Sequence, residues 1–403
     1  MRARLLAFVG AAAVLIGVIV LAQSRQVSHS GAGAAGGAAN GQPPKTAWGA
    51  PDLQGIWTSE YFTPFERPAR YADREFFTEE EIAELDKERA VFPTFTARVA
   101  ERGTVQDLSG AYDDVFQSIL PTGRRTSLIV DPPDGRIPPF TPQAQKMRSE
   151  MQAYRIALME AAEVCKSGKT PVCAGVTFTG RRSRRYAEAP PRYPAGNGLL
   201  ERINRSDGPE DRGRDERCLG GSLPEFGGYR RIVQSPTAVA LYYDLFQGQG
   251  YQRVIPITTT PHAPSQLRQW RGDSRGRWEG DTLVVDVTNF TPKTEYRGSR
   301  ENLHLIERWT RVNAKTLEYS VTVDDPTTWT KPWTVKQEMT RQDERQNRIY
   351  YEPRCHKGNY GRNALLAGAR ADEKAFRERR GPDPATKCYV PCLPQVDVED
   401  PVQ

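Results

Sequence analysis

Apolar and polar positions alternate in short segments from residue 229 to residue 360. Because successive side chains of a β-strand point to opposite faces, each alternating segment predicts one half-buried strand. Turn residues separate six or more such segments, a pattern typical of an antiparallel barrel or sandwich. The clearest apolar rows are Val239, Leu241 and Tyr243; Leu283, Val285 and Val287; Leu303, Leu305 and Trp309; and Leu317, Tyr319, Val321 and Val323. We therefore expect a β-barrel over 229–360, followed by a closing helix and a Cys- and Pro-rich tail over 361–403.

The segment 49–228 has a different pattern, which predicts helices and loops. Thr78 and Glu81 form a capping box that opens one helix, and Thr141 opens a second. Apolar residues at helical spacing follow Thr141 and predict a stripe packed in the core: Met147, Met151, Tyr154, Leu158, Ala161 and Cys165. A short strand is expected within 125–139. With the barrel, these elements predict an α+β protein.

The chain begins with a segment typical of protein export. Arg2 and Arg4 precede an apolar run at 5–22, and small residues suited to cleavage follow. The run is almost long enough to span a membrane, so a retained N-terminal anchor is the alternative to a signal peptide over 1–24. A flexible Gly- and Ala-rich linker follows over 25–48. We expect a periplasmic or secreted protein, held at the inner membrane in the anchored case.

The formal net charge of +6 is a weak bias for 403 residues. Proteins that bind nucleic acid concentrate positive charge in a patch or along one face. We therefore expect no nucleic-acid partner, and contact with a membrane only through the N-terminal segment.

The six cysteines are an even number, which in an oxidising compartment predicts disulfides. Short loops favour two pairs and leave a third, long-range pair: Cys165–Cys173, Cys388–Cys392 and Cys218–Cys355. A zinc site on cysteine is the rival interpretation, but "CYVPC" lacks a matching second pair.

Polar residues fall on three of the apolar strand faces: Glu307, Asp325 and Asn289. A buried carboxylate is costly unless it is paired or functional. Glu307 or Asp325 could therefore act as a general acid or base beside His304 or His356. The alternative is a salt bridge to one of four arginines: Arg271, Arg277, Arg308 and Arg311.

Three histidines lie outside the linker, and together they could ligate zinc with one position left open: His262, His304 and His356. None has the H-x-H or H-E-x-x-H spacing, and strand alternation places His304 on the face opposite Glu307. Zinc is thus the one cofactor that the sequence suggests, and histidines satisfied by backbone carbonyls are the alternative. No G-x-S-x-G motif and no Gly-rich phosphate loop between a strand and a helix occurs.

Five of the seven tryptophans lie in the strand region. Aromatic side chains that line a barrel suit a flat or apolar ligand, although they serve equally well to fill a core. The segment 324–334 is expected to be a loop that brings Asp325 and Trp329 to the mouth of the barrel. The residues expected to contact a small hydrophobic or aromatic molecule are Trp278, Trp309, Trp329, Tyr319, Asn289, Arg308 and Tyr360.

Several segments over residues 49–370 form a combined signature: "PDLQGIWT", "TPFERP", "RTSLIVDPPDGRIPP", "ERCL", "QWRGDSRGRWEGDTLVVDVTNF", "ENLHLIERWTRV", "DDPTTWTKPWT" and "CHKGNYGRNALLAGAR". Together they resemble a large, uncharacterised family of secreted bacterial proteins, and this resemblance implies export but no reaction. The last motif of the family usually reads Cys-His-Glu-Gly-Asn-Tyr. Here Lys357 replaces the Glu, so no role for an acid is carried over at that point.

Gly55 and Trp57 are similar to the Gly-x-Trp signature of lipocalin-like barrels, where it starts the first strand. The resemblance implies a first barrel strand over 53–58, separated from the other strands by inserted helices and loops. Trp57 is then expected to lie buried at the closed end of the barrel, beside an arginine. The expected fold is an antiparallel lipocalin-like β-barrel with a helix- and loop-rich N-terminal half.

Three functions fit these observations. The first is an exported binding protein that holds a small hydrophobic or aromatic molecule in the barrel. The second is a hydrolase, lyase or isomerase that uses Glu307 or Asp325 with His304 or His356, with or without zinc. The third is a structural protein of the cell envelope.

Overall fold

The computed structural model describes residues 43–71, 74–91, 120–193, 203–214, 216–245, 250–346, 355 and 360–388. The expected signal segment, most of the linker and residues 347–354 and 356–359 of the expected barrel region lie outside these residues. The described residues all belong to the compact unit Gly41–Gln403. None of the described helices combines the length and the apolar character needed to cross a membrane.

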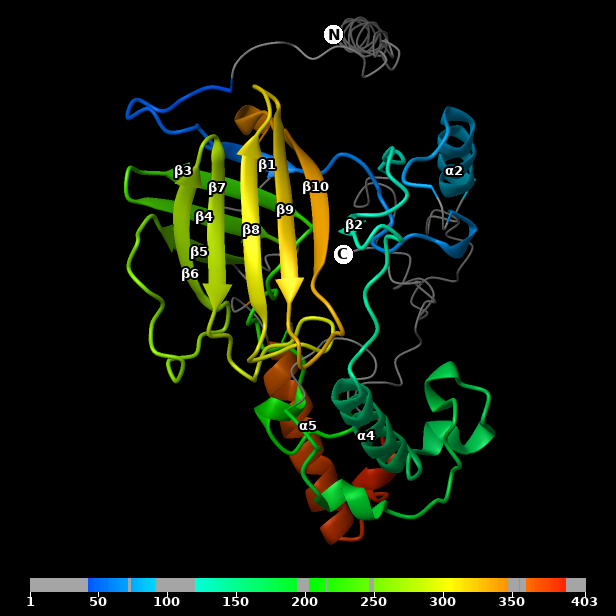
Figure 1. Ribbon diagram of the computed structural model, residues 1–403. Helices are drawn as coiled ribbons and strands as arrows, with labels where there is room; N and C mark the ends of the chain where they lie inside the picture. The colour runs from blue at the N-terminus through cyan, green and yellow to red at the C-terminus, as the bar shows by residue number, and fades with distance from the viewer. Residues whose placement is uncertain are drawn as a thin grey trace, which may run out of the picture. The chain divides into compact units, whose positions relative to one another are not determined.

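One antiparallel sheet dominates the described chain (Figure 1). Its strands are β1 Gly55–Thr58, β2 Ile129–Asp131, β3 Tyr229–Gln234, β4 Ala238–Asp244, β5 Gly250–Pro256, β6 Asp273–Glu279, β7 Thr282–Thr288, β8 His304–Arg311, β9 Thr316–Asp324 and β10 Trp333–Arg341. Nine of them follow the order β5-β4-β3-β1-β10-β9-β8-β7-β6, and β2 pairs with β10 beside this path. The expected apolar rows on or beside β4, β7, β8 and β9 are buried.

The sheet curls into a nearly closed, lipocalin-like barrel, as the sequence predicts. The strands β5 and β6 are its two ends, and we call the junction between them the seam. They approach closely at a parallel bridge between Ile257 and Gly276, where Thr258 N donates to Gly276 O over 3.0 Å. A Cβ at Gly276 would lie 2.8 Å from the side chain of Ile255, so only glycine permits this approach.

The segment with the Gly-x-Trp signature provides β1, between β3 and β10. Trp57 is fully buried, and its Nε1 donates to Leu53 O over 2.9 Å. The guanidinium carbon of Arg311 lies 5.1 Å from the centre of the Trp57 ring. Gly55 has φ +133°, and a Cβ there would lie 3.0 Å from Arg341 Nε. The signature therefore specifies a glycine that leaves room for an arginine and a tryptophan that is buried under a second arginine.

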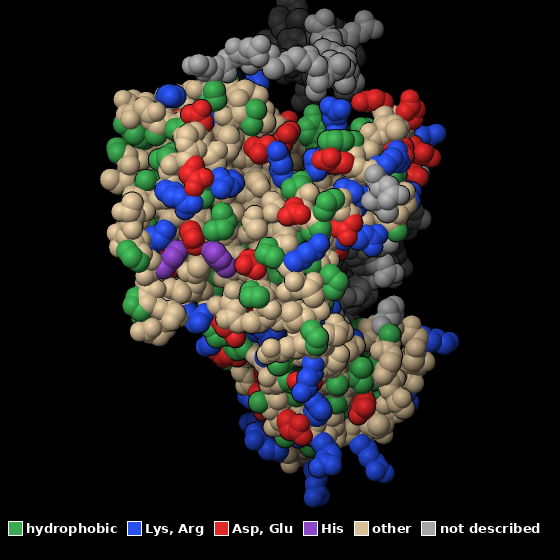
Figure 2. All heavy atoms as spheres, viewed as in Figure 1, with side chains coloured by type: hydrophobic (Ala, Val, Ile, Leu, Met, Phe, Trp, Pro, Cys, Tyr) green, Lys and Arg blue, Asp and Glu red, His purple; other side chains and the backbone are tan. Residues whose placement is uncertain are grey.

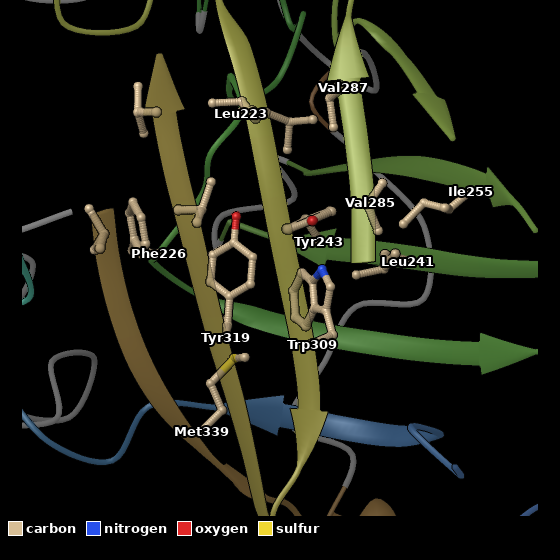
Figure 3. Packing of buried hydrophobic residues seen from close by; sticks show 14 of the residues in the cluster. Leu223, Phe226, Leu241, Tyr243, Ile255, Val285, Val287, Trp309, Tyr319 and Met339 are labelled. Atoms are coloured by element: carbon tan, nitrogen blue, oxygen red, sulfur yellow. The ribbon is translucent and has the colours of Figure 1, made fainter. Parts of the chain in front are cut away.

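Aromatic side chains, mostly from neighbouring strands, pack against one another inside the barrel (Figure 3). The ring centres of Trp309 and Tyr319 are 4.2 Å apart, and those of Phe226 and Tyr319 are 5.8 Å apart. Tyr243 stacks on Tyr251 at 4.5 Å. These rings lie at the distances of directly packed aromatic pairs, so they form a packed core.

The helices in the described part are α2 Glu79–Val91, α4 Pro142–Met159 and α5 Tyr360–Arg377. Short 3-10 helices are η1 Ala69–Tyr71, η2 Glu163–Ser167, η3 Pro171–Cys173, η4 Arg184–Ala187, η5 Pro209–Asp211, η6 Glu344–Gln346 and η7 Pro384–Thr386. The capping box of α2 is formed, since Thr78 N donates to Glu81 Oε2 and Glu81 N donates to Thr78 Oγ1, over 2.9 and 3.2 Å.

The second helix is shorter than the apolar stripe that predicts it. The side chain of Thr141 caps α4 as predicted, but the helix ends at Met159. Ala162 adopts an extended conformation, with φ −77° and ψ 122°, and this turns the chain out of the helix before Cys165. Ala161 and Cys165 are still buried. Apart from the half-buried Met147, the spacing thus identified buried positions correctly, but not the end of the helix.

Two of the expected disulfides join described cysteines: Cys165–Cys173 and Cys218–Cys355. Cys388 is also disulfide-bonded, while its expected partner Cys392 lies outside the described residues. No cysteine of the described part is free. Such a disulfide content is typical of proteins from an oxidising compartment.

Candidate functional site

A buried ion pair lies inside the barrel beside the seam. Glu307 of β8 is fully buried, and its Oε2 lies 2.6 Å from Nη2 of Arg253, which is on β5. Tyr319 donates its hydroxyl to Glu307 Oε1 over 2.8 Å. Arg253 also donates from Nε and Nη2 to Ser274 Oγ of β6, over 3.0 and 2.9 Å. Arg253 therefore links the strands on both sides of the seam to the interior.

The surroundings of this ion pair keep the neighbouring phenols protonated. Burial, with the negative charge of Glu307, raises the pKa of Tyr319 well above its usual value. Burial also raises the pKa of Tyr243 to about 12, although the charge of Arg253 opposes it. The phenols are therefore hydrogen-bond donors at neutral pH. Glu307 Oε1 accepts from Tyr319, and Oε2 is in ion-pair contact with Arg253 without a hydrogen bond of regular geometry, so this carboxylate fits an ion-pair role.

A pocket of about 540 Å³ opens on the seam next to this ion pair. Its walls include Gln252 and Arg253 of β5, Trp270 and Arg271 of the connecting loop, and Ser274 and Arg275 of β6. Arg253 and Ser274 belong to both the pocket wall and the buried cluster. The pocket thus joins solvent to the polar interior of the barrel.

The loop before β6 is held in place by backbone hydrogen bonds and one glycine. Gln269 N donates to Asn289 O over 2.8 Å. Gly272 has φ +66°, and a Cβ there would lie 2.6 Å from Thr288 O. The left-handed conformation and the close approach both require glycine. This fixed loop presents the half-buried side chain of Trp270 at the pocket.

The arginines of the pocket wall differ in their partners. Arg275 Nη1 lies 2.6 Å from Asp273 Oδ1. Arg268 donates from Nη1 to the carbonyl oxygens of Phe290 and Glu301. Arg271 donates from Nη2 to a carbonyl as well, at Leu219, over 2.6 Å. Arginine thus dominates the charged side chains of the wall.

Arg271 has an unusual environment for a cation. Its guanidinium carbon lies 3.8 Å from the centre of the Tyr251 ring. Its buried Nε has no hydrogen-bond partner in the described part of the chain. Burial lowers the pKa of Arg271 from its usual value, with a smaller contribution of the same sign from Arg214. The cation is therefore partly desolvated without a carboxylate beside it.

Glu307 and Asp325 are buried as expected, but neither lies beside His262 or His304, the two described histidines. The partner of Glu307 is Arg253, and none of the four arginines proposed from the sequence. His304 is on the outer face of β8, in agreement with strand alternation. Asp325 accepts from the Ser299 hydroxyl over 2.5 Å. It also accepts from Thr327 and Thr328, and it borders a separate pocket of about 290 Å³.

The described histidines meet on the outer face of the barrel. His262 Nε2 and His304 Nε2 each lie 3.1 Å from Asp286 Oδ1, and His262 Nδ1 lies 3.0 Å from Asp273 Oδ2. Figure 2 shows histidine and acidic side chains together on this surface. His356 lies outside the described residues. No group of three or more His, Cys, Asp or Glu side chains in the described ranges has the arrangement of a metal site.

Of the expected ligand-binding residues, Trp309, Tyr319 and Trp329 are buried in the core. Trp278 is half-buried and packs against the same core from β6. Their rings contribute to the packing of the barrel.

The other expected ligand-binding residues do not face the interior, and for Asn289, which was expected on an apolar strand face, this placement was wrong. Asn289 has φ +60°, which reverses its direction, and its Nδ2 donates to Ala263 O. The next residue, Phe290, is buried in the core in place of Asn289. Arg308 is on the outer face of β8 and pairs with Glu279 over 3.0 Å. Tyr360 is exposed at the start of α5.

The residues that sequence reasoning missed are those of β5 and the loop before β6. The segment "GYQRVIP" does alternate, with Tyr251, Arg253 and Ile255 buried. Because Arg253 lies in the middle of this row, the segment does not show an uninterrupted row of apolar residues. Trp270 and Arg271 lie in a loop, where no periodicity marks them.

Comparison with known proteins finds likeness in the fold. No family model and no curated protein matches the chain. A secretary abundant heat soluble (SAHS) protein from Ramazzottius varieornatus is 13% identical over 28% of this chain and 70% of its own, with a TM-score of 0.20. The wild-type fluorescent protein UnaG is 13% identical over 32% of this chain and 87% of its own, with a TM-score of 0.19.

Proposed function

We propose that this chain is an exported binding protein that holds a small aromatic or hydrophobic molecule in the seam pocket. The pocket volume of about 540 Å³ supports this, because small-molecule sites are concave and typically measure about 300–1,000 Å³. The half-buried ring of Trp270 offers a flat apolar surface, and Arg253 and Ser274 offer fixed polar groups. An aromatic surface beside a few fixed polar groups can bind and orient a small molecule. This pocket is the observation that carries the proposal.

The proposed ligand lies at the seam, in contrast to the site inside the barrel that the sequence first suggests. The ring centres of Trp309 and Tyr319 are 4.2 Å apart, so these side chains already satisfy each other. The pocket wall, in contrast, has polar groups and an aromatic ring that face open space.

The N-terminal segment and the disulfides support a binding protein that works outside the cytoplasm. The apolar segment at 5–22, preceded by two arginines, has the pattern of an export signal. The disulfides fit an oxidising compartment. We propose the periplasm or the secreted fraction as the location, with the N-terminal segment either cleaved or retained as an anchor.

Two fluorescent probes that share one ring system test the proposal: anilinonaphthalenesulfonate and phenylnaphthylamine, which lacks the sulfonate. We expect the purified full chain to bind at least one of them saturably while it remains folded. Trp270→Ala should weaken that binding by roughly fivefold, because an aromatic contact contributes about 1 kcal/mol. Trp48→Ala is the matched control, since Trp48 is exposed and far from the seam in sequence.

Equal affinity of the parent and Trp270→Ala would contradict a site at the seam. If neither probe binds the folded chain, the binding function fails as a whole. The structural envelope role would then be the better hypothesis.

A further inference from the structure

We infer that the ligand of the seam pocket carries an anionic group, such as a carboxylate or sulfonate on an aromatic ring, and that Arg271 and Arg268 bind this group. This inference rests on the proposed function. It specifies the chemical class of the molecule that the pocket takes.

The charges of the pocket wall are not balanced. Four arginines and one aspartate line it. Arg253 is paired with Glu307, and Arg275 with Asp273. Within the described residues, Arg268 has no carboxylate partner and donates only to carbonyl oxygens. Arg271 likewise has none, so two positive charges remain for a ligand.

Of the two arginines, Arg271 should bind an anion more tightly, because it is partly desolvated. Removing a cation from water costs free energy unless a negative charge or a full set of hydrogen bonds replaces the water. Arg271 donates to a single carbonyl oxygen, that of Leu219, and its Nε is left without a partner in the described chain. An anion at the pocket would provide the missing negative charge beside the guanidinium.

The position of this guanidinium is set before any ligand arrives. Arg271 lies on the Tyr251 ring at 3.8 Å. Gly220 has φ +70°, and a Cβ there would lie 2.7 Å from Arg271 Nη2. The ring on one side and the glycine backbone on the other restrict the side chain to one place. A preorganised cation binds an anion without the entropy cost of ordering a flexible side chain.

Trp270 provides an aromatic surface beside the two arginines of the pocket wall. It lies between Arg268 and Arg271 in the sequence, and all three residues line the same pocket. An aromatic anion can therefore place its ring near the indole and its charged group near a guanidinium. A neutral aromatic molecule would use the indole alone.

The probe pair isolates the charged group. We expect anilinonaphthalenesulfonate to bind about tenfold more tightly than phenylnaphthylamine, because a charge-assisted contact contributes about 1.5 kcal/mol or more. Arg271→Met should remove most of this difference and leave the affinity for phenylnaphthylamine unchanged. Arg271→Lys should retain part of it, since the charge remains but the planar geometry is lost. Higher salt should weaken binding of the sulfonate only.

Arg277→Met is the matched control, because Arg277 is an exposed arginine of β6 outside the pocket wall. Arg268→Met provides a second test that does not disturb the interior, since Arg268 is exposed. It should weaken the sulfonate by a smaller factor than Arg271→Met. Circular dichroism confirms that each variant is folded.

Equal affinity for the two probes, or a sulfonate affinity that both arginine variants leave unchanged, would overturn the anionic class. The proposed function would survive that result as long as Trp270→Ala still weakens binding. Loss of all probe binding in the parent would instead remove the proposed function itself.

Discussion

Arg253 on β5 and Glu307 on β8 form an ion pair inside the barrel, with Nη2 and Oε2 2.6 Å apart. The strands that carry them are far apart in the sheet order, since β5 is one end of the sheet and β8 lies beyond β6 and β7 at the other. The pair therefore crosses the barrel near its seam. Because Arg253 also lines the pocket, this pair connects the buried interior of the barrel with the pocket wall.

The ion pair should show strong coupling between its two members. We expect Arg253→Met and Glu307→Met each to lower the free energy of unfolding by about 3–5 kcal/mol, because each leaves a buried charge without its partner. The double variant should lose much less free energy of unfolding than the sum of the two single losses. Urea unfolding measures all three values.

The exposed pair between Arg308 and Glu279 is the control for that cycle. Its coupling energy should be below about 1 kcal/mol, because water screens it. Additive losses at Arg253 and Glu307 would mean that the two side chains do not depend on each other in solution.

Arg311 should be essential for the end of the barrel at β1. It donates to the carbonyl oxygens of Asp52, Asn313 and Ala314 over 2.6, 3.1 and 2.8 Å, and it lies over Trp57. Arg311→Met keeps the apolar stem but leaves three carbonyls without their donor. We expect a loss of about 1–3 kcal/mol, since these hydrogen bonds are part-buried and water can replace some of the lost donors.

Thermal unfolding followed by circular dichroism measures this effect. Arg277→Met serves as control because the side chain is exposed, and such changes are usually within about 0.5 kcal/mol. A midpoint for Arg311→Met equal to that of the control would refute the role given to these three hydrogen bonds.

Much of the barrel could be predicted because its central strands alternate cleanly. The rows from Leu283 to Val287 and from Leu317 to Val323 contain only apolar residues, so their buried face was unambiguous. The same alternation placed Glu307 inside. The spacing of cysteines predicted both disulfides that the described residues contain.

The candidate site could not be predicted, because it depends on how the sheet closes. Arg253 reaches Glu307 only after β5 and β6 meet at the seam, and strand periodicity carries no information on that meeting. Asn289 kept the period of its strand but took a left-handed conformation, so its side chain left the expected face. Trp270 and Arg271 lie in a loop that backbone hydrogen bonds and Gly272 hold in place.

The two disulfides should stabilise the fold to different extents. Cys218 and Cys355 are 137 residues apart, whereas Cys165 and Cys173 are 8 apart. A longer closed loop removes more entropy from the unfolded chain. We expect replacement of the first pair by alanine to cost about 5 kcal/mol and replacement of the second about 2–3 kcal/mol.

Both members of each pair are replaced together, so that no free thiol remains. Guanidinium unfolding under non-reducing conditions compares the two variants with the parent. Equal losses, or the larger loss for the short loop, would show that strain or local packing outweighs loop entropy.

Asp273 should make stability depend on pH in the acid range. Burial alone would raise its pKa, but the hydrogen bond from Ala263 N, the contact with His262 and the charge of Arg275 outweigh burial and lower it. A carboxyl group with a lowered pKa stabilises the folded state above its unfolded value, and this contribution is lost as the pH falls through the folded value. Asp273→Asn should therefore destabilise the protein at neutral pH and have little effect in acid.

Urea unfolding at about pH 7 and at about pH 3, on either side of the usual aspartate value, measures this difference. Glu338→Gln is the control, since Glu338 is exposed on the outer face of β10. A loss for Asp273→Asn that is the same at both pH values would mean that the change acts through packing and not through charge.

The position of β1 has a consequence for biogenesis. Its partners across the ladder are residues such as Ile232 and Arg341, far later in the chain. A chain that crosses a membrane from its N-terminus delivers β1 first, and its last partner only when nearly the whole barrel has emerged. Until then, β1 and the strands that follow it have unpaired edges, which are the parts of a sheet most prone to aggregation. If the chain is exported as proposed, the barrel closes after translocation, and its yield in the cell should depend on the holdase chaperones that meet the emerging chain.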